Sequence, residues 1–460
     1  MKNSIQTIIE HQKDFFNSGK TSDINFRKKK LIELKKEIQK NEKEIELALY
    51  KDLGKSSGES FLTEIHFIYA ELNIAIKNIN KWTRRKSVRP SLLNYPSSDY
   101  IIPQPYGITL HISPWNYPFQ LSIAPLIGAV AAGNTIVLKP SEYSENTSMI
   151  LEKIIENVFE EGFVKVVQGG PEVSSELLDH HWDYIFFTGS VGVGKIVAEK
   201  AAKFLTPTTL ELGGKNPCVV VDSATIKTTA KRIVWGKFIN CGQTCIAPDF
   251  LVVHHKIKDQ LIEELMLQIK NIYGNDTITS ESYGRIISNK HLDYLSSLLK
   301  NQKILYGGTV DAAQKYFEPT LVEITDFDSP LMQNEIFGPI LPIYGYENFD
   351  EIDEIIKKYK NPLALYIFTK NIKFGERFLH KYSFGGGAIN DTVVHIINDR
   401  LPFGGVGNSG MGKYHGEATF KTFSHFKPYI TKPLWIDLPL RYPPFEGKLK
   451  FLKRVLKLMS

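Results

Sequence analysis

The hydrophobic and polar positions near the N-terminus repeat with the period of an α-helix. Between residues 26 and 50, leucines and isoleucines recur at intervals of three, four and seven, with lysines and glutamates between them. This spacing predicts a long amphipathic helix, which we expect to end at Gly54. A second helical pattern covers about residues 60–82. The Pro- and Ser-rich stretch that follows, RPSLLNYPSSDYIIPQPYG, predicts an excursion out of the first domain.

From residue 106 the pattern changes to short β-branched runs that alternate with helical ones. The strand-like runs are GITLHIS, TIVLKP, VKVVQG and YIFFTGS, and the helical runs include FQLSIAPLIGAVAAG and YSENTSMILEKIIENVF. This alternation predicts a mostly parallel sheet with helices on both faces. A second series begins near TLELGGKNPCVVVD and extends to about residue 400, so we expect two α/β domains.

Composition narrows the class of protein. The chain has 460 residues, of which 42% are hydrophobic and 23% charged, as in soluble globular proteins. No apolar run is long enough to cross a bilayer, and the N-terminus lacks the apolar core of a secretory signal. Three cysteines cannot form a disulfide framework, so we expect a protein of the reducing cytoplasm. No basic stripe interleaved with aromatic residues suggests nucleic acid as a partner.

A glycine-rich loop, FFTGSVGVGKI, follows an apolar strand and leads into a helix that we expect to open at Lys195. Backbone N–H groups at a helix N-terminus bind phosphate well. Residues 189–195 spell G-x-x-x-x-G-K, nearly a triphosphate-binding loop, but Ile196 lacks the hydroxyl that would hold magnesium. The usual dinucleotide spacing, G-x-G-x-x-G, is also missing. The loop alone leaves a dinucleotide, a triphosphate and a turn without ligand open.

The stretch LKPSE, residues 138–142, ends another predicted strand. A carboxylate after the carboxyl end of such a strand, here Glu142, can accept hydrogen bonds from ribose hydroxyls, and Lys139 could donate to the same sugar. The alternative is a strand end followed by a serine that caps a helix.

Two of the three cysteines lie four residues apart in CGQTCIAP. A zinc site needs four ligands, but no second pair has suitable spacing, and His254 and His255 are expected at a strand end. A redox pair normally has the spacing C-x-x-C. Cys245 falls in a predicted loop, where a thiolate can be exposed and reactive. Cys218 is expected to be a buried structural thiol, and Cys241 a neighbour of Cys245 rather than its partner.

A thiol nucleophile needs a base and a donor for the oxyanion. TLELGGK offers Glu211 at the end of an apolar strand, where burial would raise the carboxyl pKa toward neutrality. A salt bridge to Lys215 is the alternative. SPWNYPF offers Asn116, whose backbone is stiffened by Pro114 and Pro118, and a simple turn asparagine is the alternative.

Seven motifs taken together resemble the aldehyde dehydrogenase superfamily, in which they occur in the same order. They are PWNYP, KPSE, FTGSVGVG, TLELGGK, GQTCIAPD, NEIFGPILP and PFGGVGNSGMGKYHG. FGGGAIND and RYPPF make the chain most similar to the class 3 branch, which includes the fatty aldehyde dehydrogenases. The resemblance extends from about residue 20 to 445.

The resemblance implies an α/β fold with two parallel-sheet domains and a β oligomerisation arm. The Rossmann-like NAD(P)-binding domain is expected at residues 1–82 and 103–210, and the catalytic domain at 211–414. The arm is expected at residues 83–102 and 415–440, and the family forms homodimers through it. The implied substrates are medium or long aliphatic or aromatic aldehydes.

The resemblance also implies a role for each matching residue. Cys245 attacks the aldehyde carbon, Asn116 and the N–H of Cys245 hold the oxyanion, and hydride passes to the nicotinamide. Glu211 activates the water that hydrolyses the thioester, and Tyr117 and Thr244 line the substrate passage. The residues expected to contact the cofactor are Trp115, Lys139, Glu142, Thr188, Gly189, Ser190, Val191, Gly192, Val193, Gly194, Glu335 and Phe337. No metal is expected, and NAD is favoured over NADP because Glu142 should repel a 2′-phosphate.

Two alternatives to this function stay open. One is a coenzyme A-acylating relative, in which a thiol replaces water at the thioester, and the presence of Glu211 counts weakly against it. The other is a catalytically silent scaffold on membranes, which the intact Cys245, Glu211 and Asn116 disfavour.

The C-terminal residues 441–460 form a basic amphipathic tail. Its last part, KLKFLKRVLKLMS, carries five basic groups and no acid, and accounts for most of the net charge of +6. Apolar residues at helical spacing among lysines suit a helix on an anionic lipid surface. Packing on a partner subunit and a frayed end are the alternatives. We therefore expect a cytoplasmic protein, with a peripheral position at the membrane surface as the variant that the tail suggests.

Overall fold

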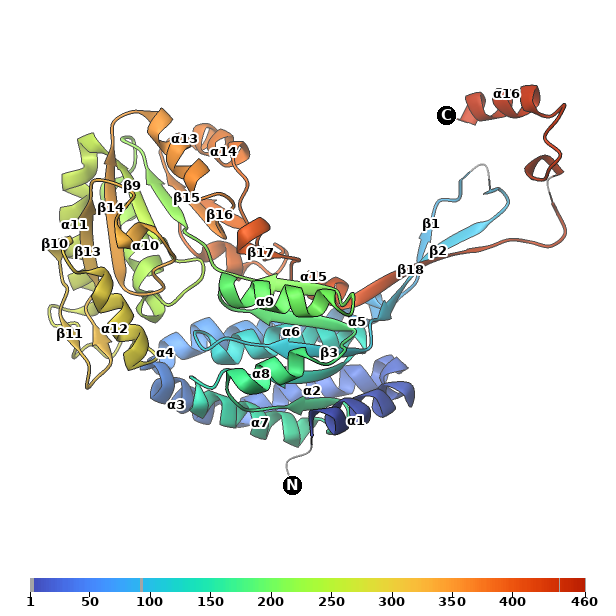
Figure 1. Cartoon of the computed structure of the whole chain (residues 1–460), viewed down its shortest axis with the longest axis horizontal. Helices are drawn as coiled ribbons and strands as arrows, with labels where there is room; N and C mark the ends of the chain where they lie inside the picture. Colours follow the sequence, from blue (N-terminus) through green and yellow to red (C-terminus); the bar gives the residue numbers. More distant parts are fainter. Residues whose placement is uncertain (1–3, 92–93, 438, 460) are drawn as a thin grey trace.

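The body of the molecule is built around two mostly parallel sheets, each covered by helices, from which a narrow arm of three strands projects (Figure 1). This computed structural model describes residues 4–91, 94–437 and 439–459. The predicted α/β fold is confirmed.

The helix predicted over residues 26–50 is two helices. They are α2 (Ile24–Lys40) and α3 (Glu42–Leu53), and they meet at Asn41, whose side-chain amide donates to the carbonyl oxygen of Glu37 (2.7 Å). This second bond to the Glu37 carbonyl accompanies a bend, because the backbone of Asn41 leaves the helical conformation (φ −101°, ψ 13°). Helix α3 ends as predicted at Gly54, which adopts a left-handed φ of 65°.

The helical pattern over residues 60–82 is confirmed, with one irregularity. A short helix α4 (Ser57–Ser60) passes through a π-helical turn, Phe61–Ile65, into α5 (His66–Trp82). Such π-turns are frequent at functional sites. Helix α1 (Ile5–Asn17) precedes this group.

The first sheet has the strand order β17-β7-β6-β3-β4-β5. The strands are β3 (Ile108–Ile112), β4 (Thr135–Lys139), β5 (Val164–Val166), β6 (Tyr184–Thr188), β7 (Thr208–Glu211) and β17 (Gly410–Met411). The helices that accompany them are α6 (Pro118–Ala132), α7 (Glu145–Val158), α8 (Pro171–Leu178) and α9 (Val191–Ala202). Strands β4 and β5 are added on one side of β3, and the chain then crosses back to add β6 and β7 on the opposite side of β3. A crevice for ligands is therefore expected at the carboxyl ends of β3 and β6.

The second sheet has the order β10-β13-β14-β9-β8-β15-β16, antiparallel at β10 and parallel elsewhere. The strands are β8 (Pro217–Val220), β9 (Phe250–His254), β10 (Lys303–Tyr306), β13 (Thr320–Ile324), β14 (Ile340–Tyr346), β15 (Ala364–Phe368) and β16 (Gly386–Ile389). The helices are α10 (Ile226–Phe238), α11 (His255–Tyr273), α12 (Asn289–Leu298), α13 (Phe349–Lys358) and α14 (Ile372–Lys381).

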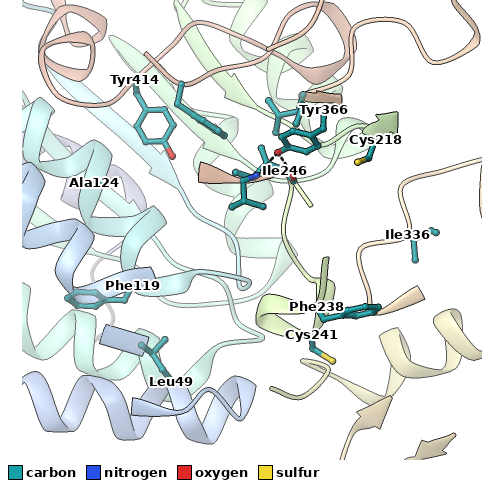
Figure 2. Close-up of a cluster of buried hydrophobic side chains, with 14 of the residues drawn as sticks. Leu49, Phe119, Ala124, Cys218, Phe238, Cys241, Ile246, Ile336, Tyr366 and Tyr414 are labelled. Atoms are coloured by element: carbon teal, nitrogen blue, oxygen red, sulfur yellow. Dashed lines mark hydrogen bonds between the residues drawn. The ribbon is translucent and has the colours of Figure 1, made fainter. Parts of the chain in front are cut away.

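One continuous cluster of buried apolar side chains extends through both halves of the body. Helix α6 is buried along its whole length, as expected for a helix that is apolar on all sides. Figure 2 shows Phe119 and Ala124 of this helix, and Phe238 and Ile336 from the second half, as parts of the same cluster. Burial of this shared surface holds the two sheets in a fixed relation.

The arm is a small antiparallel sheet in the order β1-β2-β18. Its strands are β1 (Lys86–Val88), β2 (Ser98–Pro105) and β18 (Ser424–Thr431). Just before β18, helix α15 (Glu417–Thr422) packs against α6, so the chain leaves the body only at about residue 424. The division of the chain into cofactor-binding, catalytic and oligomerisation domains stays a prediction.

The tail forms helix α16 (Leu449–Met459), which lies beyond the tip of the arm, away from the body (Figure 1). Between the arm and this helix, Leu434 is fully exposed and Trp435 is 80% exposed. Among the helices of the described residues, none combines the length and apolarity needed to cross a bilayer.

Candidate active site

The residues singled out in the sequence meet between the two sheets. Four of them follow or end strands of the first sheet at their carboxyl ends: Asn116 after β3, Glu142 after β4, Thr188 at the end of β6 and Glu211 at the end of β7. Cys245 and Glu335 lie instead in loops that lead into β9 and β14, at the amino ends of the second sheet. The side-chain amide of Asn116 donates to the carbonyl oxygen of Gln243 (3.0 Å), which joins the two sides directly.

Cys245 is half-buried in the predicted loop between α10 and β9. Its carbonyl oxygen accepts from Asn216 Nδ2 (2.7 Å), and the next carbonyl, of Ile246, accepts from the hydroxyl of Tyr366 (2.7 Å; Figure 2). Burial, and then the nearby carboxyl groups of Glu335 and Glu211, raise the pKa of Cys245 well above its ordinary value. The resting group is therefore a thiol, and its proton must be removed before the sulfur can attack.

The other two cysteines lie apart from this sulfur. Cys241 Sγ donates to the hydroxyl of Tyr283 (3.3 Å), and burial raises its pKa to about 12. Cys218 is buried on β8 beside Tyr366 (Figure 2). Within the described part of the chain, no group of three His, Cys, Asp or Glu side chains could hold a metal ion.

Gln243 fixes the loop that carries the thiol. Its Nε2 donates to the carbonyl oxygens of Asn240 and Arg285 (both 3.0 Å), and its Oε1 accepts from the N–H of Ile287 (3.0 Å). All polar atoms of this buried side chain are thus used to hold backbone, which leaves the loop little freedom.

Glu211 is a buried carboxyl group without a hydrogen-bond partner on either oxygen. The alternative salt bridge does not form, because Lys215 pairs with Asp249. Burial raises the pKa of Glu211 well above its ordinary value, and the charge of Lys413 opposes this only in part. A carboxylate whose pKa is raised accepts a proton more readily than an ordinary one, as a general base requires.

Asn116 and Tyr117 face the nucleophile loop. Asn116 is 3% exposed and uses one amide N–H on Gln243, so its second N–H remains available for an oxyanion. The Tyr117 hydroxyl lies 2.7 Å from Thr244 Oγ1, which brings the two predicted substrate residues together beside Cys245.

The glycine loop forms the N-terminus of α9. The helix begins at Val191, earlier than the predicted Lys195, because Ser190 caps it by accepting from the N–H of Val193 (3.4 Å). Space is open around Gly192, where an added Cβ would meet nothing within 4 Å. This is an accessible helix N-terminus of the kind that binds phosphate.

The flanking residues of the loop pack tightly beneath it. A Cβ on Gly189 would lie 2.6 Å from the Phe187 ring, and one on Gly194 2.5 Å from Leu212. Thr188 Oγ1 is buried and has no protein partner.

The KPSE stretch borders a polar cavity of about 190 Å³. Its lining includes Ser141, Glu142, Glu145, Ser148 and Gln168. Glu142 pairs with the buried Lys139 (2.9 Å), so a carboxylate and an ammonium group lie together at this edge. Hydroxyls and charged groups around a small cavity suit a sugar.

Glu335 lies against the GGK turn. Its carboxyl group accepts from the N–H of Gly214, and a Cβ on Gly213 would lie 1.9 Å from its Oε2. Partial burial and the neighbouring Asp249 raise the pKa of Glu335 well above its ordinary value. Two residues on, the ring of Phe337 meets that of Trp115 edge-on at 5.3 Å, as expected for residues lining one passage.

These features fit a dinucleotide. The open N-terminus of α9 suits a pyrophosphate, while Glu142 and Glu335 each suit a ribose hydroxyl pair. Ile196 occupies the position after the lysine, where a triphosphate-binding loop carries the hydroxyl that holds magnesium, so a triphosphate is disfavoured.

Several residues that shape the site were not found from the sequence. They are Lys55, Glu64, Asn216, Asn240, Gln243 and Tyr366. Gln243 and Asn240 could have been suspected as polar residues next to the cysteine in INCGQTC. Lys55 precedes the helical pattern in which Glu64 lies, and nothing in their spacing indicates a buried pair.

Comparison with known proteins agrees with this geometry. The family model described as "Aldehyde dehydrogenase family" matches residues 1–428. The 4,4'-diaponeurosporen-aldehyde dehydrogenase of Staphylococcus aureus is 45% identical over 99% of this chain and 100% of its own. The dimeric NADP-preferring aldehyde dehydrogenase of Canis lupus familiaris is 41% identical, over 97% and 99%. The substrate-bound structure of Staphylococcus aureus AldH superposes with a TM-score of 0.97 at 45% identity, over 99% of this chain and 100% of that one.

Proposed function

The chain belongs to the aldehyde dehydrogenase family and is an NAD(P)-dependent oxidoreductase of aldehydes, and from this premise we propose that the oxidation proceeds through Cys245. The sulfur attacks the aldehyde carbon, and the carbonyl oxygen becomes an oxyanion. The free N–H of Asn116 and the backbone N–H of Cys245 hold that oxygen. Each such donor contributes roughly 3 kcal/mol to the stability of the transition state.

The raised pKa of the thiol requires a base before attack. Glu211 is suited to this task, because neither of its oxygens has a partner and its own pKa is also raised. Matched proton affinities make transfer from sulfur to carboxylate easier than transfer to an ordinary, acidic carboxylate.

Bound NAD(P) supplies the acceptor for the hydride that leaves the aldehyde carbon. The acyl group then remains on Cys245 as a thioester. Glu211, once it has released its proton to solvent, takes a proton from water, and the resulting hydroxide attacks the acyl carbon and breaks its bond to sulfur. The balance is one aldehyde, one NAD(P)⁺ and one water consumed, and one carboxylic acid, one NAD(P)H and one proton formed.

The observation that carries this proposal is the buried, unpaired carboxyl group of Glu211 beside a half-buried thiol. Cys245→Ser should lower kcat by at least about 10³-fold. Glu211→Gln should slow the burst of NADH, because the thiol loses its base, and should slow steady turnover still further, by roughly 10²- to 10⁴-fold. Intact-protein mass spectrometry of the Glu211→Gln enzyme should then find an acyl adduct on Cys245. Normal turnover by Cys245→Ser would rule out the cysteine route.

The acid side of the pH profile tests the role of Glu211 further. Below its raised pKa the carboxyl group is protonated and cannot accept a proton from water. The rate of thioester hydrolysis should therefore rise with pH through that pKa in the native enzyme. The Glu211→Gln enzyme should lack this rise. Adding coenzyme A to both enzymes tests the alternative: acyl-CoA in place of the acid would establish an acylating enzyme.

We further propose a cytoplasmic homodimer that uses the arm, acts on medium or long aliphatic or aromatic aldehydes and touches membranes through its tail. The arm proposal is supported by the exposed apolar residues near its tip. The tail proposal is supported by the basic, acid-free sequence of α16.

A further inference from the structure

The backbone carbonyl of Asn116 accepts two buried hydrogen bonds. Lys55 Nζ donates to this oxygen at 3.2 Å and Asn240 Nδ2 at 2.7 Å. Lys55 and Asn240 are both fully buried, and Asn116 is 3% exposed. Two donors on one carbonyl fix the peptide plane next to the side-chain amide that holds the oxyanion in the proposed mechanism.

Lys55 is itself held rigidly. Its ammonium group pairs with Glu64 Oε1 (2.5 Å) and lies 4.0 Å from the centroid of the Tyr117 ring. The other oxygen of Glu64 accepts from the N–H groups of Phe119 (2.9 Å) and Gln120 (3.2 Å), in the first turn of α6. Glu64 belongs to the π-helical turn Phe61–Ile65, which thus aims this carboxylate at both the lysine and the helix.

Asn240 connects the same carbonyl to the nucleophile loop. It adopts a left-handed φ of 52°, which asparagine tolerates better than most residues. Its backbone N–H donates to Glu59 Oε1 (2.8 Å), and its Nδ2 also donates to the carbonyl oxygen of Gln243 (3.1 Å). The amide of Asn116 donates to that same oxygen (3.0 Å), so oxyanion donor and loop share one acceptor two residues before Cys245.

We propose that Lys55 and Asn240 are positioning residues for the oxyanion site. They clamp the Asn116 carbonyl so that its side-chain amide keeps a fixed place relative to the Cys245 sulfur. The proposal rests on the proposed cysteine route. A displacement of about 1 Å in such a donor can cost roughly 100-fold in rate, without any contact to substrate being lost.

The test compares Lys55→Met and Asn240→Gly, which remove the donors while keeping the lysine stem and the left-handed backbone. Each should lower kcat roughly 10- to 100-fold. The KM for aldehyde and the Kd for NADH, measured by fluorescence, should stay within about twofold, because neither Lys55 nor Asn240 is itself proposed to contact the aldehyde or the cofactor. Asn134→Gly is the matched control. Asn134 is a buried asparagine whose amide also donates to two carbonyls, of Ala129 and Phe423, away from the site. The Asn134→Gly substitution should lower the melting temperature but leave kcat per folded subunit unchanged.

A double-mutant cycle of Lys55→Met with Asn116→Ala distinguishes a loss of Asn116 positioning from a general disturbance of the active site. In an Asn116→Ala background there is no amide left to orient, so Lys55→Met should cost less than about threefold in kcat there. An equal loss of kcat in both backgrounds would overturn the proposal. If Lys55→Met does not fold, Lys55→Met with Glu64→Gln leaves no unpaired buried charge and carries the same comparison. Turnover by Cys245→Ser would refute the cysteine route itself, whereas an additive cycle with Cys245 still essential would refute the positioning role alone.

Discussion

Single carboxyl groups in this site owe their behaviour to their partners. Asp249 is buried but paired with Lys215, and it also accepts from the N–H of Ile336 (3.0 Å). Glu211 is equally buried and has neither. The first is a structural brace between the GGK turn and the NEIFGP loop, and the second is left free to exchange protons. Two acids of similar burial thus differ because Asp249 forms an ion pair and a hydrogen bond, whereas Glu211 feels the charge of Lys413 but forms neither.

Glu142 is the residue that should set the preference between NAD and NADP. A 2′-phosphate on the adenosine ribose would meet its carboxylate, and two like charges at about 4 Å repel each other by roughly 1–4 kcal/mol near a protein surface. Glu142→Gln should therefore raise kcat/KM for NADP relative to NAD by at least about 5-fold, the factor that corresponds to the lower value. Lys139 would then be unpaired and could itself attract the phosphate.

The measurement is initial-rate kinetics with both cofactors. The matched control is Glu156→Gln, which removes an exposed carboxylate of α7 paired with Lys165. It should change kcat/KM for neither NAD nor NADP. An unchanged ratio in the Glu142→Gln enzyme would contradict the charge argument.

At the scale of elements, the sequence predicted strongly periodic segments well and irregular ones poorly. Strands β3, β4, β5 and β6 and helix α6 lie where their apolar patterns place them, whereas β7, which the pattern assigned to the second series, and the short β17 complete the first sheet. The break at Asn41 comes from a side chain that bonds the backbone, and the π-turn before α5 comes from contacts made by Glu64 with a distant helix. The spacing of hydrophobic residues does not indicate the break at Asn41 or the π-turn. Cys245, Glu211 and Asn116 could be proposed because each sits in a recognisable motif, but the buried residues that position them could not.

Helix α16 should bind anionic membranes. Leu449, Phe451 and Leu456 are each close to half-exposed or more, and the helix carries four basic residues and no acid. Each basic group near an anionic surface contributes about 1 kcal/mol. The full-length protein should therefore pellet with vesicles containing phosphatidylserine, and the 1–445 protein should not.

The electrostatic contribution of the tail lysines to membrane binding can be tested separately. High salt, or glutamine at the three tail lysines Lys450, Lys453 and Lys457, should release the full-length protein from the vesicles. Equal pelleting of the full-length and 1–445 proteins would exclude the lipid contact.

On the scale of the whole molecule, the two sheets face the site with opposite ends. The first sheet offers the carboxyl ends of its strands, as ligand sites in open α/β sheets usually do. The second offers the loops that enter its strands, which carry Cys245 and Glu335. The proposed nucleophile and the proposed base therefore come from different halves, and the shared apolar core fixes their relative positions. This arrangement could not be predicted from the sequence of either half alone.

The arm predicts how two chains associate. Among the described residues β18 pairs with β2 alone, and Trp435 beyond it is 80% exposed, an unusual state for so large an apolar side chain in a monomer. Trp435→Glu should weaken the proposed dimer and shift sedimentation velocity profiles toward monomer at micromolar concentration. Leu205→Glu makes the same kind of change at a 90% exposed position on the body and should leave the profile unaltered. A Trp435→Glu protein that stays dimeric would place the interface elsewhere.

The protonated state of the resting thiol has a consequence for survival in an oxidising cell. Peroxides react with thiolates far faster than with thiols, and the first product, a sulfenic acid, can proceed to forms that no common reductant repairs. While no substrate is bound and the Cys245 sulfur keeps its proton, peroxide should therefore oxidise it slowly. The sulfur becomes sensitive to oxidation only during the short part of the catalytic cycle in which it is a thiolate.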